Sequence, residues 1–113
     1  MIKTNLDLVT FADDAFKKLV NKFMEKNNQY AGKVEPLANF ANGAKLRYGD
    51  DKIWSQFETA KGYALKHIAH VYGEGSNIDT PKLDESLIDI AIYSVIMLYM
   101  VKLNELEKQY EQI

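Results

Sequence analysis

The sequence predicts an all-α protein, a single domain over residues 1–113 arranged like a four-helix bundle with a long C-terminal helix. Three observations support this prediction. Apolar residues recur at three- and four-residue intervals over four segments. No segment sustains the alternation of apolar and polar residues that a half-buried strand requires. The six glycines and two prolines fall mostly between the periodic segments, where loops are expected.

The first two predicted helices differ in length. The first runs from about Thr10 to Asn27, and Thr10 with Asp13 resembles a capping box in which aspartate takes the usual place of glutamate. The second runs from about Glu35 to Lys45, with Pro36 in its first turn. One face of the first helix is apolar and consists of Phe11, Ala12, Ala15, Phe16, Leu19, Val20 and Phe23.

The third predicted helix begins after Asp50 or Asp51 and ends at Gly73, a residue type that commonly follows a helix C-terminus. Gly62 lies inside it at a cost of about 1 kcal/mol relative to alanine, which predicts a close helix contact there. The apolar face of this helix consists of Ile53, Trp54, Phe57, Ala60, Ala64, Ile68 and Val71.

The fourth predicted helix starts at Thr80 and Pro81, which suit an N-cap and a first-turn proline, and continues to the C-terminal region. Residues 87–101 are apolar on almost every side, which predicts a central helix covered on several sides. Toward the C-terminus the apolar residues follow a heptad pattern, and we expect this seam to pack either on the first helix or on another subunit. We expect a homo-oligomer with an interface at Tyr99, Leu103, Leu106 and Tyr110.

Composition and charge argue against several protein classes. The formal net charge is −2 and the 14 basic residues are scattered, which gives no surface for a nucleic-acid backbone. The absence of cysteine excludes disulfides and thiolate metal sites, and fits a reducing cytoplasm. The longest apolar run, Ile90 to Val101, is shorter than the ~20 residues of a membrane span. We expect a soluble cytoplasmic protein that binds neither nucleic acid nor membrane.

An acidic pair stands out in the last helix. Asp89 lies inside the apolar run, and Glu85 precedes it by one helical turn on the same face. Burying a carboxylate costs several kcal/mol unless a partner, a proton or a metal compensates the charge. Hard divalent ions such as Mg²⁺ or Mn²⁺ bind such oxygen pairs. Alternatively, Glu85 faces solvent and Asp89 pairs with Lys61, Lys66 or His67.

Two further groups of residues have the chemistry of a site. His67 and His70, three apart, could ligate zinc, but no third ligand has suitable spacing, so a base or a phosphate contact at His67 is the better interpretation. The stretch KNNQYAG, followed by PLANFANGAK, places Tyr30 and Phe40 among amides that can recognise a base. Asparagines also cap helices and form turns, so this stretch is equally consistent with helix ends.

Four short motifs occur in a recognisable order: KNNQYAG, PLANF, AKGYALKHI and DESLIDIAIY. They resemble those of small phage-encoded proteins with KNxDYA, PxxNF and ESxxDxANY signatures. That group is similar to the nucleotide-modification-associated domain family and, more distantly, to the MazG-like all-α nucleoside triphosphate pyrophosphohydrolases. The resemblance extends over roughly Phe23 to Tyr99.

The resemblance implies a Mg²⁺- or Mn²⁺-dependent enzyme that splits a nucleoside triphosphate into pyrophosphate and a monophosphate. In such an enzyme the metal would hold the triphosphate while a water molecule attacks phosphorus. Carried over by position, the resemblance implies metal ligands at Glu85 and Asp89, a catalytic phosphate contact at Lys61 or Lys66, and a nucleotide contact at Asn39. From the residues themselves, Glu58 is a further candidate metal ligand, and Tyr30 and His67 are further candidates for nucleotide binding.

The chain also departs from the family pattern. MazG-like enzymes pair an ExxE helix with an ExxD helix, but this sequence has no ExxE and one extra residue inside its own acidic pair. Gln29 replaces an aspartate of the phage-type pattern, and Ile92 replaces an asparagine. We expect the pyrophosphohydrolase function, and the alternative, which these departures suit, is a non-catalytic accessory protein that binds a nucleotide or a host protein. The remaining first-half metal-ligand candidates are Glu25, Glu35 and Glu58.

Overall fold

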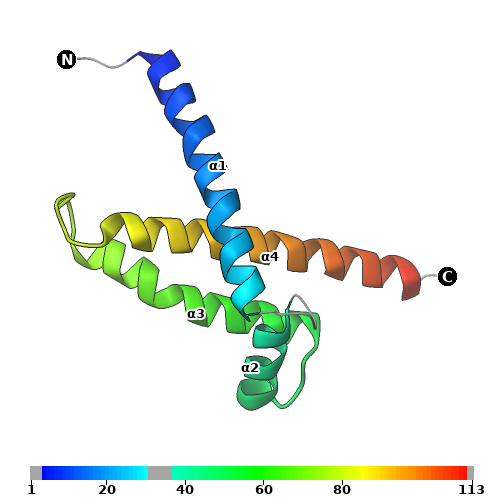
Figure 1. The fold of residues 1–113 in the computed structure, drawn as a ribbon. Helices are drawn as coiled ribbons and strands as arrows, with labels where there is room; N and C mark the ends of the chain where they lie inside the picture. The colour runs from blue at the N-terminus through cyan, green and yellow to red at the C-terminus, as the bar shows by residue number, and fades with distance from the viewer. Residues whose placement is uncertain (1–3, 31–36, 112–113) are drawn as a thin grey trace. The chain divides into compact units, whose positions relative to one another are not determined.

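The structure is a computed structural model that describes residues 4–30 and 37–111, with side chains for residues 4–26 and 37–111. Four helices, α1 (Asn5–Tyr30), α2 (Ala38–Tyr48), α3 (Ile53–Gly73) and α4 (Leu83–Glu111), make up most of this part of the chain, which contains no strand (Figure 1). The predicted all-α class is confirmed. The chain divides at Pro36 into two compact units, with α1 in the first and α2–α4 in the second. The single-domain arrangement stays a prediction.

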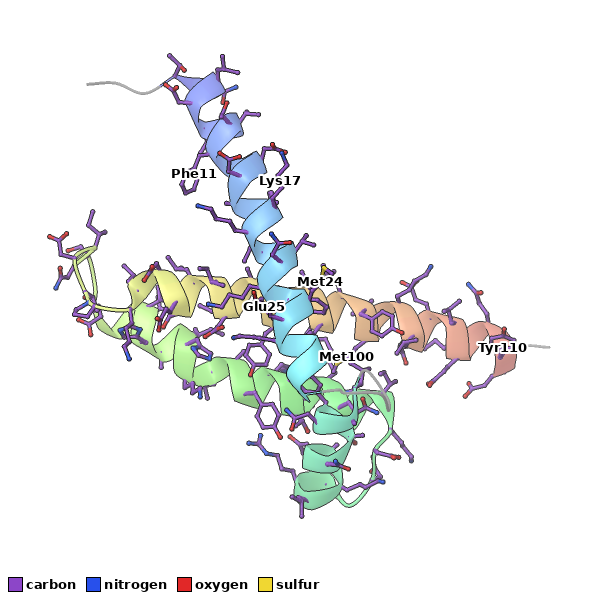
Figure 2. All side chains as sticks on the ribbon, viewed as in Figure 1. Phe11, Lys17, Met24, Glu25, Met100 and Tyr110 are labelled. Atoms are coloured by element: carbon purple, nitrogen blue, oxygen red, sulfur yellow. The ribbon has the colours of Figure 1, made fainter. Side chains whose placement is uncertain are left out.

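α1 begins at Asn5 rather than at Thr10, because a different capping box starts it. The pattern T-x-x-D occurs twice, and the structure uses the copy formed by Thr4 and Asp7. The Asp7 N–H donates to the Thr4 hydroxyl at 3.2 Å, and the Thr4 N–H donates to the Asp7 carboxylate at 3.0 Å. Hydrogen bonds from the Thr4 backbone and hydroxyl lower the pKa of Asp7. Asp13 pairs instead with Lys17, 2.8 Å away on the same helix (Figure 2).

α1 is the only helix among residues 4–30, the described part of the first unit. α1 continues to Tyr30, past the predicted end at Asn27. A single helix cannot bury an apolar face on itself. Three large residues of the apolar stripe of α1, Phe11, Phe16 and Val20, are accordingly exposed.

α2 occupies residues 38–48, three positions later than predicted, and the predicted first-turn residues Glu35 and Pro36 lie outside the described residues. Gly49 ends the helix in the left-handed region, with φ 80° and an N–H that donates to the Lys45 carbonyl at 3.0 Å. The helix therefore ends at Tyr48, three residues after the predicted end at Lys45.

α3 begins at Ile53, close to its predicted start. The Asp50 carboxylate holds this end of the helix by accepting hydrogen bonds from the Ser55 hydroxyl at 2.6 Å and from the Lys52 N–H at 3.0 Å. These hydrogen bonds, with the Ser55 hydroxyl contributing most, lower the pKa of Asp50. Trp54, predicted on the apolar face, is instead 64% exposed and packs edge-on against Tyr48, with 6.2 Å between ring centroids.

α4 begins at Leu83 rather than at the predicted Thr80-Pro81 pair, which forms a turn instead. The Leu83 N–H donates to the Thr80 carbonyl at 3.3 Å, and Lys82 has φ 65°. Proline followed by a left-handed residue is typical of a type II turn, where glycine is the usual second residue. The Thr80 hydroxyl lies 3.1 Å from both a Glu74 carboxylate oxygen and the carbonyl oxygen of Asn77, so it stabilises the loop rather than the helix end.

α3 and α4 lie side by side and run in opposite directions (Figure 1). Their register is fixed by two contacts, from His67 to Asp89 and from His70 to Ser86. Extending this register along both helices places Ile53, the first residue of α3, opposite Leu103. The remainder of α4 therefore extends past the start of α3.

The core of the second unit lies where α2 meets this helix pair. Gly43 allows the close approach of α2 and α3. A Cβ at Gly43 would overlap the Tyr63 hydroxyl and a Thr59 methyl group. At Gly62 the neighbour is the end of the flexible Arg47 side chain, so the close helix contact predicted there stays a prediction. The buried residues are Phe40, Ala60 and Met100, with Leu37, Ile53, Phe57, Tyr63, Tyr93, Ile96 and Met97 packed against them.

α4 presents apolar residues on two faces. Ser86, Ile92 and Met100 are buried, whereas Leu87 and Leu98 are exposed. α4 was predicted to be covered on several sides, but within the second unit it packs mainly against α3, with Tyr93 also meeting Phe40 of α2. By length and composition α4 is apolar enough to cross a membrane, a property that core helices of soluble proteins share.

Candidate functional site

The carboxylate of Asp89 faces α3, where it lies opposite His67. The distance from Asp89 Oδ2 to His67 Nδ1 is 3.6 Å, which suits an ion pair with a protonated imidazole better than a hydrogen bond. The two side chains are only 18% and 17% exposed. Asp89 has therefore lost most of its water and gained a partner that carries positive charge when protonated.

A second polar contact lies one turn along the same interface. His70 Nδ1 and Ser86 Oγ are 2.7 Å apart, and Ser86 is buried. A serine beside a histidine has the chemistry of a nucleophile and its base. Here, however, the hydroxyl is buried between the helices and the nearby carboxylate of Asp89 pairs with His67 rather than with His70. The arrangement therefore fits an interhelical hydrogen bond.

Aromatic side chains connect this polar cluster to the core. The ring of His67 lies against Tyr93, with 6.0 Å between centroids and 31° between planes. Tyr93 meets Phe40 edge-on at 6.4 Å, and Phe40 meets Tyr63 at 5.7 Å. The Arg47 guanidinium lies 5.3 Å from the centroid of the Tyr63 ring. Tyr93 therefore contacts both His67 of the polar cluster and Phe40 of the core.

The three predicted metal ligands do not form one cluster. Glu58 pairs with Lys61 at 2.9 Å on the surface of α3. Along α3 it is about 13 Å from His67, the residue opposite Asp89, at a rise of about 1.5 Å per residue. Glu85 is exposed one turn before Asp89. In residues 4–30 and 37–111, no three histidine or carboxylate side chains lie close enough together to hold a metal ion.

The other predicted site residues are dispersed. Lys66 is exposed on α3, and Asn39 is exposed in the first turn of α2. Tyr30 is the last residue of α1, and its side chain lies outside the described residues. Of the remaining acidic candidates, Glu25 belongs to α1, in the first unit, and Glu35 lies outside the described residues (Figure 2).

The predicted oligomer interface lies toward the C-terminal end of α4. Tyr99, Leu106 and Tyr110 are exposed, and Leu103 is half-buried opposite the start of α3. Tyr110 lies near the end of the helix, beyond the reach of α3 (Figure 2). The seam is therefore available for contact with another chain, and its role as an oligomer interface stays a prediction.

The residues of the family-like motifs have packing roles in this structure. In DESLIDIAIY, Ser86 contacts His70 of α3, and Asp89 and Tyr93 contact His67. In AKGYALKHI, Gly62 accommodates Arg47, and Tyr63 packs on Phe40. The buried members of the same motif are Ala60 and Ala64.

Sequence reasoning missed Ser86 as the partner of His70, and it missed the contact of Arg47 with Tyr63. The first of these left a signal in the sequence. His67 and His70 are three apart, and so are Ser86 and Asp89, on two helices joined by a short loop. Matching spacings on neighbouring antiparallel helices predict paired contacts.

Comparison of the chain with family models, curated proteins and solved structures finds no match.

Proposed function

We propose that this chain is a non-catalytic helical module that binds a protein partner through α4. The observation that carries this proposal is the pairing of Asp89 with His67. The charge of the largely buried Asp89 carboxylate needs a compensating group, and the His67 imidazole supplies one without a metal ion. The remaining candidate ligands are either exposed, as Glu85 is, or paired with a lysine, as Glu58 is.

The surface of α4 supports a protein partner. Large apolar side chains are exposed along most of its length, and Leu98 and Tyr110 reach 68% and 76% exposure. Contiguous exposed apolar surface commonly marks an interaction site. The C-terminal part of α4 extends past α3, which makes it accessible from several sides.

A turnover assay tests the proposal. Purified full-length protein is incubated with each ribo- and deoxyribonucleoside triphosphate in Mg²⁺ and in Mn²⁺, and the products are separated by chromatography. We expect no monophosphate or pyrophosphate above background. A ligand that binds only the folded state raises Tm. Because we expect no metal binding, Mg²⁺ and Mn²⁺ should leave Tm unchanged. Turnover that the substitution Asp89→Asn abolishes would contradict the proposal.

A second candidate function is the nucleoside triphosphate pyrophosphohydrolase implied by the resemblance. It is favoured by the placement of Glu85 and Asp89 one turn apart on α4. In that case Mg²⁺ or Mn²⁺ would bind both carboxylates after His67 moves away, and Lys61 or Lys66 would contact phosphate. Asn39, Tyr30 and His67 would then be the candidates for binding the nucleotide.

The stability of Asp89→Asn separates the two functions. If Asp89 is a metal ligand, Mg²⁺ or Mn²⁺ raises the free energy of unfolding of the wild type, and Asp89→Asn abolishes that rise. If Asp89 is only the structural partner of His67, neither metal ion changes the free energy, and Asp89→Asn lowers it by roughly 1–2 kcal/mol with or without metal. Urea denaturation in a chelator and in each metal ion measures the difference.

A further inference from the structure

α4 carries a second apolar surface on the side away from α3. Its members fall on two interleaved rows, 87-91-95-98 and 87-91-94-98, with three- and four-residue steps, and therefore share one face of the helix. Ile92 and Met100, which are buried, lie on the other side. We call this surface the outer stripe, and it consists of Leu87, Ala91, Ser94, Val95 and Leu98. Its three large residues, Leu87, Val95 and Leu98, are all at least half exposed.

The two ends of the outer stripe carry opposite charges. Asp84 lies one turn before Leu87, and Lys102 lies one turn after Leu98, on the same face. Asp84 has no ion-pair partner among the residues that the structure describes. Lys102 is 3.8 Å from Glu105 in an exposed pair, a type that contributes little to stability. Both charges are therefore available to a partner.

The middle of the outer stripe can approach another helix closely. Ala91 and Ser94 are small, so a facing backbone can come near. The Ser94 hydroxyl donates to the Ile90 carbonyl at 2.8 Å within α4. Because this donor is already satisfied, the serine can be covered without losing a hydrogen bond to water.

We propose that a second copy of this chain covers the outer stripe, with the two α4 helices antiparallel. This inference rests on the proposed function and identifies its partner. In this arrangement a two-fold axis passes between the two outer stripes, at the level of residues 92–93. Asp84 then lies opposite Lys102 of the partner subunit, and Leu87 lies within one residue of the level of Leu98 of the partner subunit. Each contact occurs twice, as an isologous interface requires.

The charge pattern selects this orientation. A parallel pair would place Asp84 against the partner's Asp84 and Lys102 against the partner's Lys102, and like charges in contact oppose association. The outer stripe with its end charges is about 27 Å long, at about 1.5 Å per residue. One helix pair of this length buries less than the roughly 800 Å² per partner of a standard interface. We therefore expect a dimer with a dissociation constant in the micromolar range.

Analytical ultracentrifugation of the full chain tests the apolar contact. Wild-type protein should sediment as a dimer at high concentration and dissociate to the 12.9 kDa monomer on dilution. Leu98→Asp introduces two carboxylates into the interface and should weaken the dimer by about 100-fold or more. Leu46→Asp is the matched control, because Leu46 is an exposed leucine on α2. It should leave the dissociation constant unchanged.

Charge exchange tests the orientation. Asp84→Lys and Lys102→Glu, each alone, place like charges together at both ends and should weaken the dimer about 10-fold. The double variant restores both pairs and should recover wild-type affinity. An equimolar mixture of the two single variants should also recover it, because every contact is again between opposite charges.

Three results would overturn the proposal. One is a monomer at every concentration, a second is a dimer that Leu98→Asp leaves intact, and a third is a double variant no tighter than the single variants. Binding of phosphatidylcholine vesicles by monomeric protein, lost in Leu98→Asp, would show that lipid covers the stripe instead. None of these results bears on nucleotide turnover, so the non-catalytic function is tested separately by the turnover assay.

Discussion

The two ends of the contact between α3 and α4 are built from different chemistry. At one end, near α2, Phe40, Ala60 and Met100 form an apolar cluster that excludes water. At the other end, toward the connecting loop, His67 pairs with Asp89 and His70 bonds to Ser86. The same two helices thus combine an apolar end and a polar end.

The two ends contribute differently to the stability of the fold and to the register of α3 against α4. Burying a methionine side chain stabilises a fold by roughly 1.5–3 kcal/mol, whereas a hydrogen bond contributes about 1 kcal/mol net. Apolar side chains tolerate a shifted neighbour, but a one-turn slip at the polar end would leave Asp89 and Ser86 without their histidines. We infer that the apolar end supplies most of the stability and that the polar end fixes the pairing of the helices.

The largest expected effect is at the apolar end. Met100 is fully buried, and Met100→Ala should lower the free energy of unfolding by about 3 kcal/mol, through lost burial and the cavity left behind. Urea denaturation followed by circular dichroism measures this change. Leu46→Ala on the exposed surface is the control and should change stability by less than about 0.5 kcal/mol. Similar losses in both variants would show that the apolar end is not the main source of stability.

An intermediate effect is expected where α2 meets α3. Gly43→Ala places a methyl group against Tyr63 and Thr59, and should destabilise the fold by roughly 1–3 kcal/mol. Gly73→Ala is the matched control, because no neighbouring atom lies within 4 Å of a Cβ there. That variant should be neutral or slightly stabilising. Thermal denaturation of the two variants gives the comparison, and a neutral Gly43→Ala would mean that the helices are not closely packed at this point.

The smallest effect is expected in the turn that leads into the polar end. Lys82 has a left-handed φ of 65°, which a side chain disfavours. Lys82→Gly should therefore raise the free energy of unfolding by about 0.5–1 kcal/mol, in contrast to the loss that glycine causes inside a helix. Chemical denaturation measures the gain. A loss of stability would indicate that Lys82 contributes more through its side chain than its backbone conformation costs.

The sequence predicted the presence of the four helices, but it predicted their first residues less well. Apolar periodicity located all four helices, because residues at three- and four-residue spacing share one helix face whatever element lies next to it. The start of α1 was misplaced because two copies of T-x-x-D fit the same capping pattern, at Thr4 and at Thr10. The start of α4 was misplaced because Thr80 and Pro81 suit a turn as well as a helix N-terminus.

The candidate site was only partly predictable. His67 was among three possible partners of Asp89, and local pattern could not choose among them, since the choice depends on the register of α3 against α4. The register could have been predicted from two features of the sequence: the short loop between the helices, and the three-residue spacing that His67 and His70 share with Ser86 and Asp89. Exposure of the outer side of α4 could not be predicted, because an apolar sequence does not indicate what covers it.

The most direct test of the central claim, that Asp89 is held by His67, is a double-mutant cycle. The free energy of unfolding is measured in chelator for wild type, Asp89→Asn, His67→Gln and the double variant. We predict a coupling energy of about 1 kcal/mol between the two positions, because each single variant leaves the other group without its partner. Losses that add within about 0.3 kcal/mol, together with a Mn²⁺-dependent rise in Tm that Asp89→Asn abolishes, would contradict the claim and identify Asp89 as a metal ligand.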